Sequence, residues 1–174
     1  PVDVPGEEQG LVDYGFVGDI EGVTSETLKR QLDAGFLPVI SPLSADAAGT
    51  LLNINADTVA AALAAALEAE KLIIATGAPG ILEDPDNPAS LVSYIDLAGL
   101  ARMKAEGRLA SGMAPKSDAI RSAIEGGVRR VHVISQELPD SLLLEVFTNE
   151  GTGTLVVADT GSLTAAEQGV DKNG

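Results

Sequence analysis

The chain has 174 residues, of which 45% are hydrophobic and only 3% aromatic, so a single domain with a core of Ala, Leu, Ile and Val is expected. Its formal net charge of -15 argues against nucleic acid and anionic membranes as partners, because phosphates need clustered Lys and Arg. There is no cysteine, no secretory leader pattern in residues 1–10 and no apolar run long enough to cross a bilayer, so we expect a cytoplasmic protein without disulfides.

The first part of the sequence predicts two helices separated by strand-like segments. Residues 1–10 are polar and contain Pro and Gly, and we expect an extended lead-in there. Thr24 is expected to cap a helix that ends near residue 34, and Asp57 to cap a long Ala-rich helix. Between these helices the sequence predicts a buried strand at 36–40, a loop at 44–49 and a strand at 50–54.

The remainder alternates short apolar runs with helical patterns. Asp96 is expected to cap a helix that ends near residue 107, and Pro115 to take the first position of a helix whose end is marked by two glycines at 126–127. Ser141 is expected to cap one more helix. The other predictions are strands at 72–75, 91–95, 131–135 and 154–158, a turn at 76–80, an exposed loop at 83–89 and a polar tail at 159–174.

This alternation predicts an α/β fold with a mainly parallel sheet and helices on both faces. The sequence shows no internal repeat and no domain boundary, so we expect one domain over residues 11–158. In such folds ligands bind beyond the carboxyl ends of the strands, near helix N-termini. Three segments fit that position, namely 52–57, 76–80 and 112–116.

Lys116 is the cation of most interest. It is expected in the first turn of a helix, where the macrodipole disfavours a positive charge, and an anion bound at that end would repair the mismatch. The alternative is a lysine that points into water. Asp57 has two interpretations as well, a simple helix cap or a carboxylate that holds a catalytic lysine in place.

The remaining polar candidates are also open to two interpretations. Asn53 and Asn55 alternate on one predicted strand, and one of them could bind a substrate carboxylate or simply form a turn. His132 is the only histidine and lies within a predicted strand, which favours a structural role over catalysis. No histidine or cysteine cluster supports a zinc site, and neither GxxxxGK[ST] nor GxGxxG occurs in the chain.

Eight segments in this order resemble the amino acid kinase family, and within it the acetylglutamate kinase branch. Examples are GFLPVISP at 35–42, NINADT at 53–58 and GMAPK at 112–116. The other segments are 14–20, 79–82, 127–132, 142–148 and 151–154, so the resemblance runs over most of the chain.

The resemblance implies phosphoryl transfer from ATP, with Mg²⁺, to the side-chain carboxylate of N-acetyl-L-glutamate in arginine biosynthesis. It implies that Lys116 stabilises charge on the transferred group, that Asp57 organises the catalytic lysines and that Asn53 binds the acetylglutamate. The residues that it places along the nucleotide are Thr76, Gly77, Gly80, Gly112, Met113 and Lys116.

The resemblance also implies feedback control. Glu145 and Gly151 lie in a segment that looks like the carboxyl-terminal part of arginine-inhibited members, and a carboxylate is a good partner for a guanidinium. We expect a possible L-arginine effector site there. The alternative is a solvated glutamate on a helix.

Two departures from the family pattern matter. Gly77 stands where the family usually has Asp, beside the nucleotide. The amino-terminal lobe, which supplies a Gly-rich loop, a second catalytic Lys, a substrate-binding Arg and the usual dimer interface, has no counterpart before residue 12. We therefore expect the carboxyl-terminal lobe of a homo-oligomeric kinase, inactive by itself. The alternatives are a non-catalytic nucleotide-binding or regulatory module and a related kinase with another carboxylate substrate.

Overall fold

The computed structural model describes residues 15–110, 112–148 and 151–162 of the chain. The predicted lead-in at 1–10 and most of the predicted tail lie outside the described residues. The elements, in chain order, are α1 (Glu26–Asp33), β1 (Leu43–Ala45), β2 (Leu51–Asn53), α2 (Ala56–Ala66), β3 (Lys71–Thr76), β4 (Tyr94–Asp96), α3 (Leu97–Ala105), α4 (Met113–Glu125), β5 (Arg130–Ser135), α5 (Ser141–Phe147), β6 (Thr154–Val157) and the 3-10 turn η1 (Thr160–Ser162).

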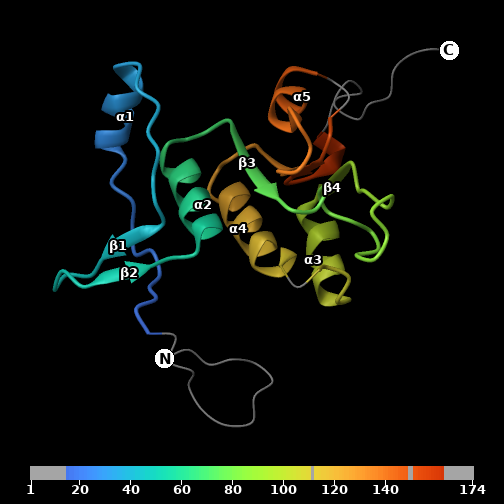
Figure 1. Ribbon diagram of the computed structural model, residues 1–174, viewed down its shortest axis with the longest axis horizontal. Coiled ribbons are helices and arrows are strands. Elements are labelled where there is room, and N and C mark those ends of the chain that lie inside the picture. The colour runs from blue at the N-terminus through green and yellow to red at the C-terminus, as the bar shows by residue number, and fades with distance from the viewer. Residues whose placement is uncertain (1–14, 111, 149–150, 163–174) are drawn as a thin grey trace, which may run out of the picture.

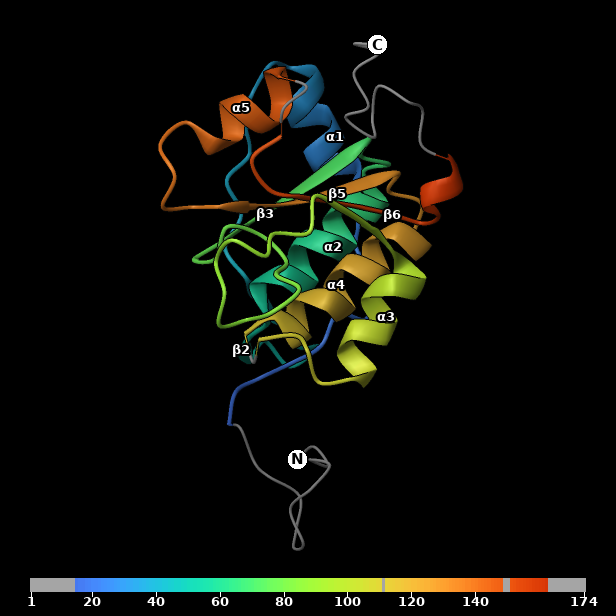
Figure 2. The same cartoon turned by 90° about the vertical axis from the view of Figure 1, so that its right-hand side faces the viewer.

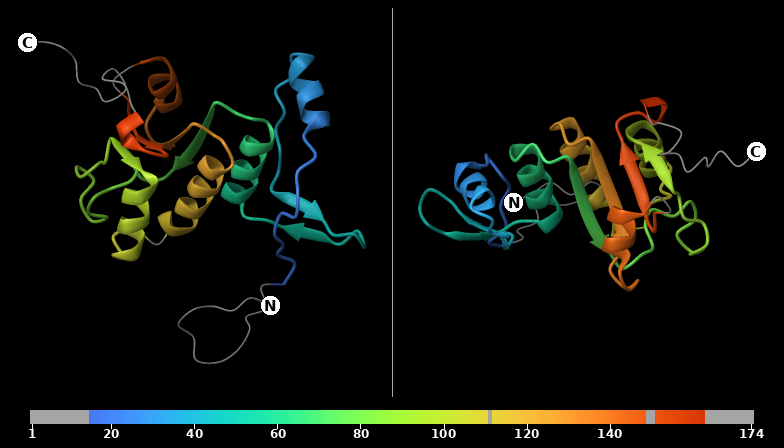
Figure 3. Two further views of the ribbon diagram at one scale, coloured as in Figure 1. Left: turned by 180° about the vertical axis from the view of Figure 1, so that it is seen from behind. Right: turned by 90° about the horizontal axis from the view of Figure 1, so that it is seen from above.

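Four strands form the main sheet, in the order β3-β5-β6-β4 (Figure 3, right). β3 pairs parallel with β5 and β4 pairs parallel with β6, whereas β5 and β6 are antiparallel. His132, in the middle of β5, is opposite Ile73 of β3 and Leu155 of β6. The predicted α/β fold with a mainly parallel sheet is confirmed, and the β5–β6 pair is its antiparallel exception.

Helices cover both faces of this sheet, as predicted. α2, α3 and α4 lie on one face, and α5 lies on the other (Figures 1 and 2). The core is on the three-helix side, where fully buried Val131, Val133 and Val156 of the sheet belong to one hydrophobic cluster with Ile120 and Ala123 of α4. No helix in the described part of the chain is both long and apolar enough to span a membrane.

α2 and α4 pack side by side at close range because small residues line their contact. Ala61 and Ala64 of α2 and Ala123 of α4 are buried there. A Cβ at Gly126, just after α4, would be 2.7 Å from the Cβ of Ala65. Both helices begin at the same end of this contact, so their first turns are neighbours.

The segment 15–55 lies to one side of the main sheet, where α1 and the antiparallel β1–β2 pair stand beside α2 (Figures 1 and 3). The prediction of a buried strand at 36–40 is wrong. These residues form no strand, and the exposed fractions of Leu37 and Val39 are 88% and 93%. An apolar segment of this kind needs a neighbouring strand, and none of the described residues pairs with it.

Several helix ends differ from the predictions by a residue or two, as is usual for caps. Ser25, not Thr24, precedes α1, and Asp140, with a left-handed φ of 58°, precedes α5 in place of Ser141. Pro115 is the third residue of α4 rather than the first. The prediction for Asp96 is confirmed, since its side chain accepts a hydrogen bond from the backbone N–H of Gly99 at 2.7 Å.

Two strand predictions also need correction. The predicted loop at 44–49 begins inside β1, which pairs with β2 before a turn held by the Asp46 side chain. The predicted strand at 91–95 is shifted to Tyr94–Asp96, and Leu91 forms only an isolated bridge with Leu82. The exposed loop at 83–89 agrees with the prediction.

Candidate nucleotide and substrate site

The centre of the candidate site is an ion pair between the first turns of α2 and α4. The Nζ atom of Lys116 is 2.9 Å from each carboxylate oxygen of Asp57. The two side chains are 21% and 19% exposed, so the pair is largely buried yet still accessible from one side. The structure thus joins two predicted site residues that are 59 positions apart in the sequence.

The start of α2 explains how Asp57 is held. Asn55 is the N-cap, and its Oδ1 atom accepts hydrogen bonds from the backbone N–H groups of Asp57 at 2.9 Å and Thr58 at 3.2 Å. The prediction that Asp57 caps this helix is therefore wrong. Asp57 lies in the first turn instead, where the helix dipole favours a carboxylate.

At the start of α4 the charge is unfavourable for the helix dipole, in contrast to the start of α2. Lys116 is in the first turn of α4, where the dipole disfavours a cation, and Asp57 supplies the compensating charge from the neighbouring helix. Lys116 therefore does not simply point into water. A second anion that reached this end of α4 would meet a lysine already fixed in place.

Asn53 ends β2, two residues before the cap of α2. Its backbone N–H donates to the carbonyl of Phe16 at 2.8 Å, and its carbonyl accepts from the N–H of Gly18 at 3.0 Å. The backbone of this residue is therefore held by the preceding segment. Asn53 itself is exposed.

The predicted turn at 76–80 follows β3 directly. The carbonyl of Thr76 accepts a hydrogen bond from the N–H of Gln136 at 2.8 Å, which ties the turn to the end of β5. A Cβ at Gly77 would fit without a clash, because its nearest neighbour, Oε1 of Glu137, would lie at an ordinary contact distance of 3.8 Å. Gly80 is different, since a Cβ there would be 2.7 Å from both Leu91 Cδ1 and Thr154 Oγ1.

α2 and α4 pack on β3 and β5, the strands that follow them in the chain. A helix that precedes a strand and packs against it antiparallel begins near the carboxyl end of that strand. This topology puts the Lys116–Asp57 pair and the turn at 76–80 at the same edge of the sheet. Gly112 is the N-cap of α4 and the side chain of Met113 is buried in the core. The backbone N–H of Met113 donates to the carbonyl of Ala110 at 2.8 Å.

Glu145, on α5, is buried rather than solvated, so the alternative of a solvated glutamate is wrong. Its Oε1 is 2.7 Å from Nδ1 of His132, and its Oε2 accepts from the backbone N–H groups of Thr152 at 2.6 Å and Gly153 at 3.2 Å. The hydrogen bond with His132, followed by those with the two backbone N–H groups, holds the pKa of Glu145 below its ordinary value. Gly151 precedes this turn and adopts a φ of 51°.

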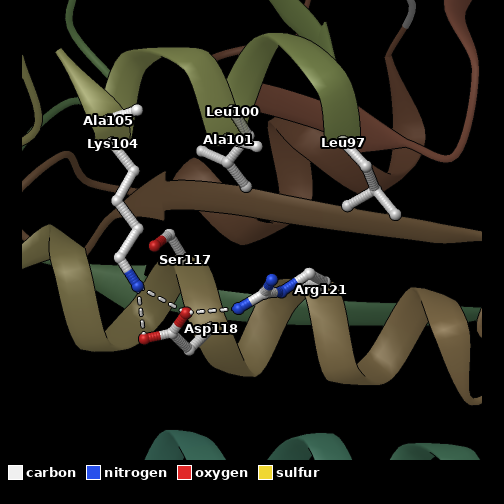
Figure 4. Close-up of a pocket in the computed structure, with 8 residues that line it drawn as sticks. All are labelled: Leu97, Leu100, Ala101, Lys104, Ala105, Ser117, Asp118 and Arg121. Carbon is white, nitrogen blue, oxygen red and sulfur yellow. Dashed lines mark hydrogen bonds and ion pairs between the residues drawn. The ribbon is translucent and has the colours of Figure 1, made fainter.

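Sequence reasoning did not identify the groove between α3 and α4, which has a volume of about 450 Å³ (Figure 4). Asp118 on α4 is 2.5 Å from Nζ of Lys104 and 2.8 Å from a guanidinium nitrogen of Arg121. Lys104 and then Arg121 hold the pKa of Asp118 below its ordinary value. Both cations are thus already paired, and the groove is lined by residues of α3 and α4 that include neither Asp57 nor Lys116.

Within the described residues, no group of three or more acidic or histidine side chains converges in a way that could hold a metal ion. Asp57 is paired with Lys116, and Glu145 is paired with His132 of β5.

A sequence model of the amino acid kinase family matches residues 1–135, most of the chain. The chain belongs to the amino acid kinase family. Acetylglutamate kinases of the family that resemble it include those of Archaeoglobus fulgidus, 49% identical over 87% of this chain, and Myxococcus xanthus, 49% identical over 93% of it. The match covers 52% and 53% of those two proteins, so this chain spans about half the length of these relatives.

Two solved structures have a similar fold. N-acetylglutamate synthase from Neisseria gonorrhoeae, in complex with coenzyme A and L-arginine, has a TM-score of 0.77 at 30% identity, over 85% of this chain and 34% of that one. A carbamate kinase from Giardia lamblia has a TM-score of 0.55 at 20% identity, over 76% of this chain and 42% of that one, and shows the fold alone.

Proposed function

We propose that this chain is the carboxyl-terminal, nucleotide-binding part of an acetylglutamate kinase. The reaction would transfer the γ-phosphoryl group of ATP to the side-chain carboxylate of N-acetyl-L-glutamate, a step of arginine biosynthesis. The observation that carries the proposal is the Lys116–Asp57 pair between two helix starts, in a chain 49% identical to acetylglutamate kinases. The cytoplasm is the proposed location.

In the proposed reaction a carboxylate oxygen of the acceptor attacks the γ-phosphorus, the bond to the leaving oxygen of ADP breaks, and an acyl phosphate forms. Acceptor and donor are both anions, so the chemistry depends on positioning and on cations around the transferred group. Lys116 would contact that group, and Asp57 would keep the lysine from moving. Asn53 would hold the acetylglutamate beside the start of α2.

The nucleotide would lie along the strand-end turn and the entrance of α4. The support is the room at Gly77, where a Cβ would meet its nearest atom only at 3.8 Å, and the open space at the N-cap Gly112, where a Cβ would meet nothing within 4 Å. Backbone N–H groups at a helix start favour phosphate. Mg²⁺ would arrive with the phosphates and neutralise part of their charge, and no step of the proposal needs a protein-only metal site.

We further propose that turnover needs the other half of the kinase. The relatives are about twice as long as the matched region. Apolar residues of the segment 15–55 are exposed, among them Phe36, Leu37 and Val39, and an apolar patch of this kind marks a contact surface. The 174-residue chain by itself should therefore show only background activity, and the complete enzyme is proposed to be a homo-oligomer.

L-arginine remains a proposed effector at the turn that follows α5. The support is the carboxylate of Glu145 beside Gly151, together with the likeness to a synthase whose structure holds L-arginine. Because Glu145 already has partners on both oxygens, a guanidinium would have to share the carboxylate with them or displace one.

One observation favours a second candidate, a non-catalytic nucleotide-binding or regulatory module. Gly77 offers no side chain to the proposed nucleotide, where a carboxylate is expected from the resemblance. Binding without turnover would fit such a module. Its nucleotide site would be the same, so the two candidates differ in catalysis alone.

The experiment measures acetylglutamate-dependent ADP release by the purified 174-residue chain, first alone and then mixed with the amino-terminal half of the Archaeoglobus fulgidus relative. We expect activity only on mixing, and its loss in Lys116→Ala but not in Lys104→Ala. Robust turnover by the chain alone would refute the need for a second half. Silence in both assays, with nucleotide binding intact, would favour the non-catalytic module.

A further inference from the structure

A chain of contacts connects the proposed nucleotide turn to α5 on the other face of the sheet. Thr154, the first residue of β6, is completely buried. Its Oγ1 accepts a hydrogen bond from the backbone N–H of Ile81 at 2.8 Å, across 73 positions of sequence. Ile81 directly follows the turn at 76–80, so this single hydroxyl fixes the point where that turn ends.

The backbone at Gly80 also packs so closely on Thr154 that no side chain would fit between them. A Cβ on Gly80 would be 2.7 Å from Oγ1 of Thr154 and 3.1 Å from its backbone nitrogen. The end of the turn therefore rests directly on Thr154. If Thr154 moved, the backbone at 80–81 would have to move with it, because close-packed interiors transmit small displacements.

The residues just before Thr154 are held from α5. Oε2 of Glu145 accepts from the N–H groups of Thr152 and Gly153, and its Oε1 contacts His132 of β5. Gly153 is also pressed against the sheet, since a Cβ there would be 2.1 Å from the carbonyl oxygen of Val133. The backbone that leads into Thr154 thus has a fixed position set by one carboxylate.

Taken together, these contacts run from Glu145 through residues 152–153 to Thr154 and then to the turn at 76–80. We propose that Thr154 is a positioning residue. It couples the turn at 151–153, which Glu145 holds, to the turn at 76–80, where the nucleotide is proposed to bind. The proposal rests on the proposed nucleotide site, and it gives that site a route of regulation. Anything that changes the bonding of Glu145 should alter nucleotide affinity through Thr154, with no contact to the nucleotide itself.

The first measurement is amide hydrogen exchange of Ile81 in the full 174-residue chain. In Thr154→Val the N–H of Ile81 loses its acceptor, and we expect its local exchange to accelerate about 3- to 10-fold, the equivalent of one buried hydrogen bond. Thr154→Ser keeps the hydroxyl and should exchange as the wild type does. Glu145→Gln, two steps away, should also accelerate exchange at Ile81.

Val131→Ala is the matched control. Val131 is fully buried in the same sheet, at the opposite end of β5 from the turn. Its truncation should lower global stability as much as Thr154→Val or more, without selective exchange at Ile81. Equal exchange at Ile81 in the wild type and Thr154→Val would refute the role of Thr154, and an unchanged Ile81 in Glu145→Gln would refute the coupling.

The second measurement is calorimetric affinity for MgATP. We expect Thr154→Val to weaken binding by about 3- to 10-fold, with Thr154→Ser and Val131→Ala close to the wild type. Equal affinities of the wild type and a folded Thr154→Val would overturn the proposal. If the wild type itself binds no nucleotide, the proposed function fails, and the exchange experiment still decides whether Thr154 couples the two turns.

Discussion

Replacing Lys116 by Ala should weaken nucleotide binding, and the structure suggests by how much. A hydrogen bond to a charged group contributes about 1.5–3 kcal/mol. Lys116 already makes two 2.9 Å contacts with Asp57, so a phosphate would share the ammonium rather than gain all of it. The lower end of the range is therefore expected, which corresponds to a loss in affinity of about 10-fold.

The same variant leaves a carboxylate without its partner. Asp57 is only 19% exposed, and in Lys116→Ala its charge would repel the phosphates. The double variant Lys116→Ala with Asp57→Asn removes that repulsion and should recover part of the lost affinity. A recovery of this sign would show that Asp57 faces the nucleotide as well as the lysine.

The assay is isothermal calorimetry with MgATP on the wild type and the variants at one ionic strength. Lys104→Ala is the matched control, because Lys104 is also a helix lysine paired with one carboxylate, Asp118. It lies in the α3–α4 groove and should leave affinity unchanged. Equal affinities of Lys116→Ala and the wild type, or an equal loss in Lys104→Ala, would refute the assignment of Lys116 to the site.

Three further predictions concern glycines and Glu145. Gly80→Ala should lower the free energy of unfolding by about 1–3 kcal/mol in urea, because its Cβ would sit 2.7 Å from Thr154 Oγ1, whereas Gly77→Ala has room and should change it by less than about 0.5 kcal/mol. Because the pKa of Glu145 is lowered from 4.5, its stabilising effect is present above that pH and is lost as the pH falls through the lower folded-state pKa. The stability gap between the wild type and Glu145→Gln should therefore narrow on acidification, and a gap that widens would contradict the hydrogen bonding described. Arginine should raise the melting temperature of the wild type but not of Glu145→Gln, and no shift in either would remove the effector site from this chain.

The regular elements with strong local signals were predictable from the sequence. Ala119, Ile120, Ala123 and Ile124 follow the helical period, and they form the buried face of α4. The short apolar runs that became β3, β5 and β6 are strands flanked by turn residues, and β5 and β6 are mostly buried. These features depend on neighbours within a few positions, which is the range over which sequence patterns are informative.

Helix caps were less predictable because several residue types compete for the same position. Asn55 and Asp57 are both good N-caps by composition, and the sequence alone favoured Asp57. In the structure the cap is Asn55, whose side-chain Oδ1 accepts hydrogen bonds from two backbone N–H groups. The difference matters for the site, since it frees the Asp57 carboxylate to hold Lys116.

Contacts between distant residues account for the parts of the site that the sequence left open. The sequence singled out Lys116, Asp57 and Glu145 one by one, yet nothing in their spacing indicates a Lys116–Asp57 pair. For Glu145 the sequence left two interpretations open, a carboxylate that binds arginine and a solvated glutamate on a helix. Its burial comes from α5 lying on β5 and from the turn at 151–153, which are tertiary features.

The segment 36–40 connects the failed strand prediction to the proposed function. Its apolar residues have the composition of a buried strand, and a strand contributes stability only through cross-strand neighbours and a covered face. In this chain the segment lies exposed beside α2, with Leu37 and Val39 almost fully accessible to solvent. At 36–40 the local sequence favours a buried strand, but the tertiary structure leaves the segment exposed. In the main sheet the local preference and the tertiary environment agree. A disagreement of this kind is resolved if another polypeptide segment covers these residues, and a kinase about twice as long as the matched region would have chain available to do so.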